Sequence, residues 1–270
     1  MQKLTRAKRI LFWFTLLNLI SLPFSMKSLA ETNNQGNIVI FKRYIEDMSH
    51  WQTLIAEATM ITRAEGYHQP IHLYFNFYHD RATINLIKTQ IEIKQNSDHS
   101  KGMIALDIVQ AANHQQWIYL PVLNLTKKIT PDPKSRFFRT ALTFRDMSLL
   151  DKNILLNQYE IFSVDDHQVI LRLKTTAPAD LALYSKIVIL MDFKQPQIKE
   201  MQLFTQGNVP ERSVSHFNFA AKRDKTGSLR PLNWTVTDKQ HTTEVLWNSY
   251  QTNPEKMNPN WFNAALLKPH

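Results

Sequence analysis

Short segments in which apolar side chains recur at every second position fill most of this 270-residue sequence. The clearest covers residues 71–78, where one face carries Ile71, Leu73, Phe75 and Phe77. Val169, Leu171 and Leu173 repeat the pattern and alternate with the charged Arg172 and Lys174. Alternation of this kind is typical of a half-buried β-strand. Further strands are predicted at 87–93, 115–120, 185–193, 198–204, 213–221, 232–238 and 243–250.

The connections between these segments are too short for parallel strands. Turn-forming residues lie at 165–167, 194–196, 207–208, 225–227 and 238–240. A parallel crossover needs about a dozen residues or more, so consecutive strands should be antiparallel neighbours. We therefore predict a mainly β protein: a large curved antiparallel sheet of about ten to twelve strands, forming an unclosed half-barrel.

Two helices and one irregular segment should accompany the sheet. An amphipathic helix near the N-terminus is predicted from the helical spacing of Ile38, Phe41, Ile45 and Met48. At the C-terminus, Asn258 is suited to cap a helix that begins at Pro259. Residues 131–153 show neither the two-residue period of a strand nor the spacing of an amphipathic helix. An interruption of this length inside a compact sheet is usually functional. We expect it to be a lid.

The first thirty residues have the features of an export signal. Four basic residues precede an apolar run from Ile10 to Ile20, and Ser28 and Ala30 supply the small residues that a signal peptidase recognises. We expect cleavage after Ala30, a single domain over residues 31–270 and a periplasmic location. An uncleaved anchor helix is the alternative, although residues 10–24 are fewer than the roughly 20 that span a bilayer. No later segment approaches a membrane span.

Composition excludes several classes of protein. Loss of the signal removes five positive charges and lowers the formal net charge from +9 to +4. The remaining basic residues are scattered, so nucleic-acid binding is not supported. The chain has no cysteine, and therefore neither a disulfide nor a cysteine that could carry a lipid.

Residue clusters typical of catalysis or metal binding are also missing. His72 and His79 lie seven positions apart on one predicted strand and face opposite ways, so they cannot share a metal ion. Asp165, Asp166 and His167 occupy a predicted turn, where aspartate is favoured for local hydrogen bonding. No nucleophile elbow or phosphate-binding loop occurs. We expect no catalytic residue, no metal and no cofactor; a hydrolase with a convergent triad is the weakest alternative.

The segment 115–130 is unusual because both faces of its first strand are apolar. Trp117 and Tyr119 point one way, and Ile118 and Leu120 point the other. Such a strand must have packed core or an apolar ligand on each side. The sequence leaves open which of the two rows contacts which.

Several short motifs resemble those of a known family. Residues 117–121 (WIYLP), 127–129 (KKI), 135–138 (SRFF), 143–147 (TFRDM) and 183–189 (LYSKIVI) resemble the core of exported outer-membrane lipoprotein-sorting proteins, relatives of the LolA periplasmic lipoprotein carrier. Residues 232–234 and 260–262 extend the similarity, which runs from about residue 115 to 267. Arg139 and Arg145 depart from the family pattern, so the chain resembles a divergent member.

The resemblance implies a carrier or sensor that binds the acyl chains of a lipoprotein or a lipid in an apolar groove under a helical lid. An inner-membrane exporter is a further expected partner. An adaptor that works with such an exporter and carries no lipid is the alternative function. Aromatic and apolar residues of the predicted sheet and lid are the groove candidates: Phe75, Phe77, Trp117, Ile118, Tyr119, Leu120, Phe137, Phe138, Phe144, Tyr184 and Trp234.

Overall fold

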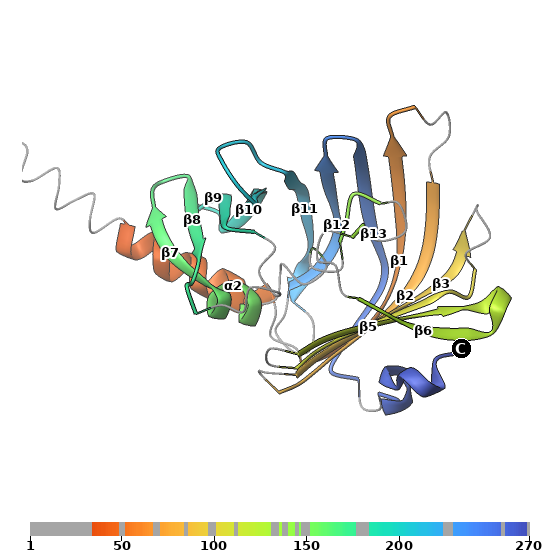
Figure 1. Cartoon of the computed structure of the whole chain (residues 1–270). Coiled ribbons are helices and arrows are strands. Elements are labelled where there is room, and N and C mark those ends of the chain that lie inside the picture. Colours follow the sequence, from red (N-terminus) through yellow and green to blue (C-terminus); the bar gives the residue numbers. More distant parts are fainter. Residues whose placement is uncertain are drawn as a thin grey trace, which may run out of the picture.

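One antiparallel sheet of thirteen strands makes up most of the described part of the chain (Figure 1). The computed structural model describes residues 34–48, 52–66, 71–83, 86–96, 101–110, 113–130, 135–136, 140–143, 146, 152–176, 184–223, 229–254 and 257–268. The predicted signal peptide lies outside these residues. The strands are β1 (Thr53–Ala64), β2 (Ile71–Thr83), β3 (Leu86–Asn96), β4 (Ile104–Gln110), β5 (Asn113–Leu120), β6 (Leu125–Ile129), β7 (Tyr159–Val164), β8 (Gln168–Leu173), β9 (Lys186–Asp192), β10 (Gln197–Phe204), β11 (Arg212–Arg223), β12 (Leu229–Asp238) and β13 (His241–Thr252).

The order of the strands is that of two meanders joined at the middle. Strands β1 to β6 lead outward to one edge, β7 to β13 lead inward from the other, and β1 pairs with β13 at the centre. The prediction of a mainly β, unclosed antiparallel sheet is confirmed, with thirteen strands instead of ten to twelve. Strand β1 was not among the predicted strands. Its alternation of apolar side chains is weak, because the small residues Ala56 and Ala58 occupy two of its buried positions.

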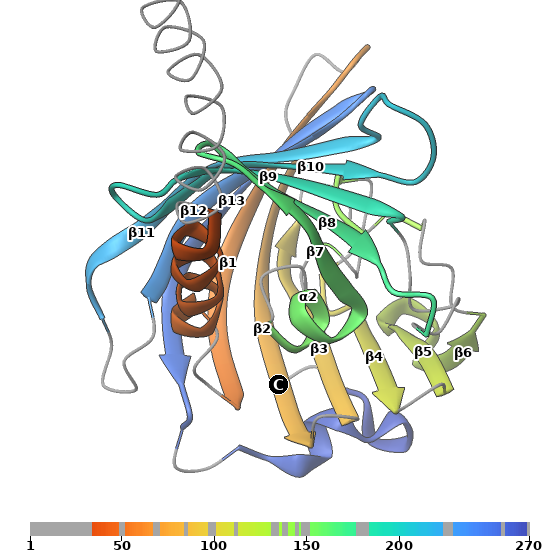
Figure 2. The ribbon, with the colours of Figure 1, turned by 90° about the vertical axis from the view of Figure 1, so that its left-hand side faces the viewer.

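The two edge strands, β6 and β7, are consecutive in the sequence but lie at opposite ends of the sheet. The chain between them must therefore travel the width of the sheet. Its described parts include Ala141 and Leu142, and Leu155 of helix α2 (Lys152–Gln158), all of which pack in the core on the concave side (Figure 2). Of the irregular segment predicted over residues 131–153, the described residues Ala141 and Leu142 therefore lie on the concave face.

The main apolar core occupies the concave face. Residues 34–48 form the predicted amphipathic helix, and Phe41, Ile45 and Met48 point from it into this core. Those three positions share one helical face, as their spacing predicts. The helix thereby covers part of the sheet (Figure 2).

A smaller apolar cluster lies on the convex face beneath the C-terminal residues. Here the ring of Trp261 packs on Tyr78 with centroids 4.3 Å apart, and Phe262 and Leu267 are buried. The expected C-terminal helix is replaced by two short 3₁₀ helices, η3 (Pro259–Phe262) and η4 (Ala264–Leu266). Asn258 caps the first, as predicted, but the side chain of Asn263 accepts a hydrogen bond from Ala265 N–H and begins a new turn.

Within the described residues, none of the helices has the length and apolar character needed to cross a bilayer.

Candidate functional site

Aromatic side chains gather at the centre of the concave face. The ring of Trp247 on β13 lies 6.4 Å from that of Phe75, 5.8 Å from Phe77 and 6.2 Å from Trp234, measured between centroids. Phe217 on β11 makes an edge contact with Trp234 at 6.1 Å. Inclined ring pairs at such distances are favourable beyond the area that they bury. We call these five residues the aromatic cluster; each is 8% exposed or less.

The strand register divides the remaining candidates on β5 between the two faces. Ile118 lies opposite the buried Ala105 of β4, so Ile118 and Leu120 share the concave face, where both are half-buried. Trp117 and Tyr119 instead belong to the convex cluster, together with Phe262. The question that the sequence left open, which row of β5 points inward, is thereby answered in favour of the Ile118 row. Phe137, Phe138 and Phe144 lie outside the described residues.

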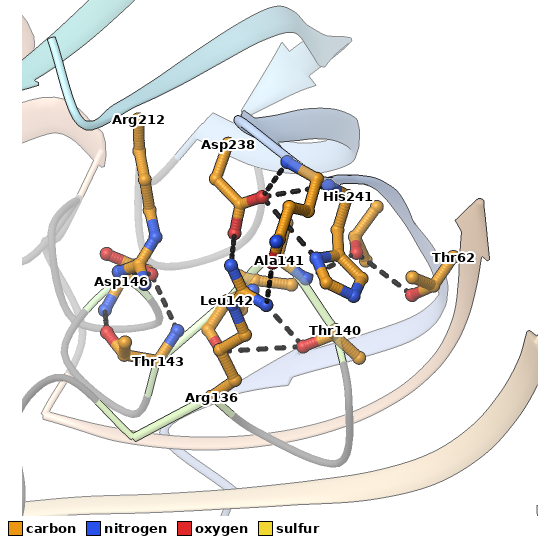
Figure 3. A network of polar contacts seen from close by, with 12 residues as sticks. Thr62, Arg136, Thr140, Ala141, Leu142, Thr143, Asp146, Arg212, Asp238 and His241 are labelled. Atoms are coloured by element: carbon orange, nitrogen blue, oxygen red, sulfur yellow. Dashed lines mark hydrogen bonds and ion pairs between the residues drawn. The ribbon is translucent and has the colours of Figure 1, made fainter. Parts of the chain in front are cut away.

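The chain itself covers the concave face. Ala141 and Leu142 are fully buried and pack in the same core as the aromatic cluster. Arg136 and Thr143 form an isolated antiparallel bridge, so these two residues lie side by side. We call the described residues 135–136, 140–143 and 146 the cover segment (Figure 3). Few of the described side chains in the cover segment are apolar. Polar contacts therefore contribute much of the free energy that holds the segment against the sheet.

Asp146 fixes one end of the cover segment to the sheet. Its Oδ1 accepts a hydrogen bond from the hydroxyl of Tyr184 at 2.6 Å, and its Oδ2 accepts from Nη1 of Arg212 at 3.2 Å. The backbone N–H of Thr143 also donates to Oδ2, at 2.6 Å. Nη1 of Arg212, on β11, lies 3.0 Å from the hydroxyl oxygen of Tyr184. Tyr184 was predicted as an apolar groove residue, but its hydroxyl takes part in the hydrogen bonds around Asp146 and Arg212.

Burial makes these groups dependent on one another. It raises the pKa of the Asp146 carboxyl, while the charge of Arg212 and the hydrogen-bond donors oppose that rise. Burial, followed by the charge of Asp146, raises the pKa of Tyr184 far above its ordinary value, so its hydroxyl remains protonated and can donate. Burial is the largest single influence on Arg212 and lowers its pKa, but the attractions of Asp146, Tyr184 and Glu211 together outweigh it, so the net direction is upward. Removal of either charged partner would leave the other buried and uncompensated.

Two further contacts hold the cover segment. The backbone N–H of Ala141 donates to the hydroxyl of Thr243 at 2.8 Å, and Thr243 in turn contacts Thr62 at 2.9 Å. Near the sheet end, Nη2 of Arg136 lies 2.9 Å from Oδ2 of Asp238 (Figure 3). The cover segment is therefore tied to β11, β12 and β13, and through Thr243 indirectly to β1, by a small number of specific polar contacts.

The indole N–H groups of Trp234 and Trp247 are buried in the aromatic cluster and find no acceptor among the described residues. A buried donor without a partner costs roughly 1–3 kcal/mol. The two rings contact each other, so both donors lie in one region of the concave face. This region would gain from a carbonyl or other acceptor oxygen supplied by a bound molecule.

A hollow of about 500 Å³ lies at the end of the sheet, beside the cover segment. Polar and charged side chains dominate its lining, among them Arg136, Glu211, Arg212 and Asp238. A lining of this kind does not suit acyl chains. The aromatic cluster is therefore the better candidate for an apolar ligand.

A row of polar side chains lies on the concave face of β2 to β5. His79, Thr89, Asp107 and Gln116 are neighbours in the register of these strands and are buried. His79 Nδ1 lies 3.0 Å from the hydroxyl of Thr89, and Gln116 donates to Asp107 at 2.7 Å. Ile87 and Val109, which pair with each other, follow this row on the same face, so the row is a polar band across an apolar surface. Burial, aided by the charge of Arg81, lowers the pKa of His79 to about 3.

His79 should make the folded protein sensitive to mild acid. The unfolded chain takes up a proton near the ordinary histidine pKa of about 6.5, whereas folded His79 stays neutral down to about 3. Stability is therefore fully present above that unfolded pKa and falls as the pH drops toward 3, by about 2 kcal/mol between pH 7 and pH 5. Urea unfolding at several pH values should show that His79→Asn removes this dependence. The exposed His167→Asn serves as a control, and an unchanged slope in His79→Asn would contradict the assignment.

The Asp146–Arg212 contact was not predicted from the sequence, because its partners lie 66 positions apart. One signal was available: Asp146 is the single acidic residue in the basic and aromatic stretch 134–146. In the described ranges, no three histidine, aspartate or glutamate side chains are grouped as metal ligands would be.

A covered, unclosed antiparallel sheet of this kind defines the LolA-like fold. A domain from Vibrio parahaemolyticus, described as an outer membrane lipoprotein-sorting protein domain, matches with a TM-score of 0.68 and 16% identity, over 84% of this chain and 96% of that domain. A DUF1329 family protein from Desulfovibrio piger gives a TM-score of 0.68 and 16% identity, over 86% and 98%. A LolA superfamily protein from Nitrosomonas europaea gives 0.58 and 10%, over 83% and 96%.

The chain belongs to the family whose model, described as "Uncharacterized protein", matches residues 88–268. Comparison with curated proteins found no match. At the identities given above, the solved structures show the fold that this chain shares with them.

Proposed function

We propose that this protein is a periplasmic carrier or sensor that binds the acyl chains of a lipoprotein or a lipid against its concave face. The observation that carries the proposal is the aromatic cluster, which lies in the same buried core as a cover segment tied down by few polar contacts. The predicted signal peptide supports export, and the fold is shared with proteins described as lipoprotein-sorting and LolA superfamily proteins.

Binding would exchange the cover segment for cargo. Each CH₂ group of an acyl chain that leaves water contributes about 0.8 kcal/mol, so a chain of ordinary length can compensate for the displaced apolar residues and polar ties. An ester or amide carbonyl near the end of that chain would accept hydrogen bonds from the indole N–H groups of Trp234 and Trp247. The proposal requires no catalytic group, metal or cofactor.

One observation favours the alternative, an envelope adaptor that serves a membrane exporter and carries no lipid. The concave face is already filled by the protein's own residues, including Phe41, Ala141 and Leu142. In that case the aromatic cluster is packed core, and the cover segment has no reason to move.

Mass spectrometry of natively purified protein separates the two functions. A carrier should retain acyl lipids and should take up a fluorescent fatty acid that retained lipid displaces. If no acyl species is retained and no probe is taken up, the carrier function is wrong and the adaptor remains.

Two matched isoleucine substitutions test the location of the site. Ile118 is half-buried on the concave face, and Ile108 is half-buried on the convex face of the neighbouring strand. Ile118→Ser should weaken probe binding about tenfold, because roughly 1.4 kcal/mol of apolar contact is lost. Ile108→Ser should leave probe binding unchanged at a similar cost in unfolding free energy. Equal effects of both on probe binding would place the ligand elsewhere.

A further inference from the structure

The turn between β5 and β6 presents apolar side chains to water. Val122 is 88% exposed, Leu123 65% and Leu125 47%, and Val122 is the most exposed large apolar residue in the described part of the chain. Isolated exposed apolar residues are common, but three within four positions on one projecting turn form a patch. We call residues Pro121–Leu125 the apolar turn.

The apolar turn has a defined conformation. Residues Pro121–Leu123 form the 3₁₀ helix η1, and Asn124 follows in the left-handed region with φ of 46°. The N–H of Asn124 donates to the carbonyl of Pro121 at 3.1 Å, and the buried Tyr119 donates its hydroxyl to the Asn124 side chain at 3.0 Å. The backbone of the turn is therefore already ordered, with Val122 and Leu123 exposed. Contact with a partner would cost little further conformational entropy.

The charged side chains of the hairpin that carries the apolar turn are all positive. Residues 113–130 contain Lys127 and Lys128 and no aspartate or glutamate. Both lysines are exposed and follow Leu125 by two and three positions on β6, which places them roughly 7 and 10 Å behind it. Nζ of Lys128 lies 5.4 Å from the ring centroid of the half-buried Trp117. An apolar tip with lysines and a tryptophan at this depth matches the layered chemistry of a bilayer surface.

We propose that the apolar turn inserts into the surface of a membrane that contains anionic phospholipid. The three apolar side chains fall well short of the roughly 800 Å² per partner that a stable protein interface buries. A bilayer needs no complementary surface and accepts side chains that reach about 5–10 Å into its headgroup region. Phosphate groups at that level would pair with Lys127 and Lys128.

Membrane docking goes beyond the proposed carrier function and does not require it. If the protein does carry acyl chains, the position of the turn has a further use. Leu120 and Leu125 are partners in the β5–β6 register, and Ile118 follows on the same face. This apolar row leads from the inserted turn onto the concave face.

Vesicle flotation with the signal-free protein tests the docking. The probe is a set of phosphatidylcholine vesicles with and without about one-third phosphatidylglycerol, at low and at physiological salt. The protein should float with the anionic vesicles more than with the neutral ones. Substitution of both Lys127 and Lys128 by Gln should reduce that preference roughly fivefold for each lysine.

Two valine substitutions separate insertion from charge effects. Val122→Asp should lower the vesicle partition coefficient at least tenfold, whereas Val209→Asp should leave it unchanged. Val209 is a fair control because it is 73% exposed and lies in the turn between β10 and β11. Circular dichroism should show both variants folded. Absence of wild-type flotation, or equal flotation of Val122→Asp and the wild type, would overturn the docking; so would an equal loss in both variants.

The outcome is independent of the carrier test. Val122→Asp should take up the fluorescent fatty acid normally, and Ile118→Ser should still float with vesicles. Failure of the probe assay therefore refutes the carrier function alone, and failure of flotation refutes the docking alone.

Discussion

Replacement of Arg212 by methionine is expected to lower the free energy of unfolding by about 3–5 kcal/mol. Arg212 is 5% exposed and is the cation that faces the carboxylate of Asp146. Its loss would leave that carboxylate buried with only neutral hydrogen-bond donors. Urea unfolding measures the loss directly. Hydrogen exchange should report faster opening of residues 140–143, since the N–H of Thr143 donates to the same carboxylate.

A double variant tests whether the loss arises from the pair. Arg212→Met combined with Asp146→Asn removes both charges and should recover more than half of the lost stability. Arg172 is a matched control because it is exposed on β8, where it stacks on Phe162; Arg172→Met should cost less than about 1 kcal/mol. Under the carrier function, Arg212→Met should also take up the fluorescent fatty acid faster than the wild type. A cost below about 1 kcal/mol for Arg212→Met would contradict the role of the ion pair.

Replacement of Trp247 by alanine should have an effect of similar size, about 3–5 kcal/mol, because the ring is in contact with four others at the centre of the sheet. Phenylalanine at this position should cost about 1 kcal/mol, since it keeps most of the ring contacts and removes the indole donor that lacks an acceptor. The Trp247→Phe protein is therefore suitable for binding experiments.

The indole donor itself is tested by a comparison of two probes. Trp247→Phe should weaken the binding of a fluorescent fatty-acid ester about fivefold, which corresponds to one lost hydrogen bond. The binding of a hydrocarbon dye without an acceptor oxygen should not change. Trp261→Ala, on the convex face, should affect neither probe. Equal weakening of both probes would show that Trp247 provides only apolar contact.

Periodicity and turn chemistry were sufficient to predict the type of fold. The alternation of residues 71–78 and the short turns dictate antiparallel neighbours, and these local rules do not depend on distant residues. The pairing of β1 with β13 could not be predicted in this way. It joins residues about 190 positions apart, and the backbone groups along the edge of a strand can pair with almost any other strand.

The arrangement of the candidate residues could not be predicted from local sequence, for a related reason. Parity along β5 gives two rows, but only the register with Ala105 of β4 assigns Ile118 to the concave face. Phe75, Phe77 and Trp234 were named as groove candidates and lie in one aromatic cluster, whereas the contact between Asp146 and Arg212 joins residues 66 positions apart. Local sequence contains no information about that contact.

The central pairing of β1 with β13 has a consequence for how the chain is made. Leu54 lies opposite Thr252, so the middle of the sheet is built from the first and the last strand in the sequence order of the sheet. During synthesis, strands β1 to β6 would form with an unpaired edge at β1 until residue 252 has emerged. Contacts of such long sequence separation form slowly, and an open strand edge pairs readily with other chains. A nascent or exported chain of this topology should therefore depend on a holding chaperone more than a simple meander of equal length does.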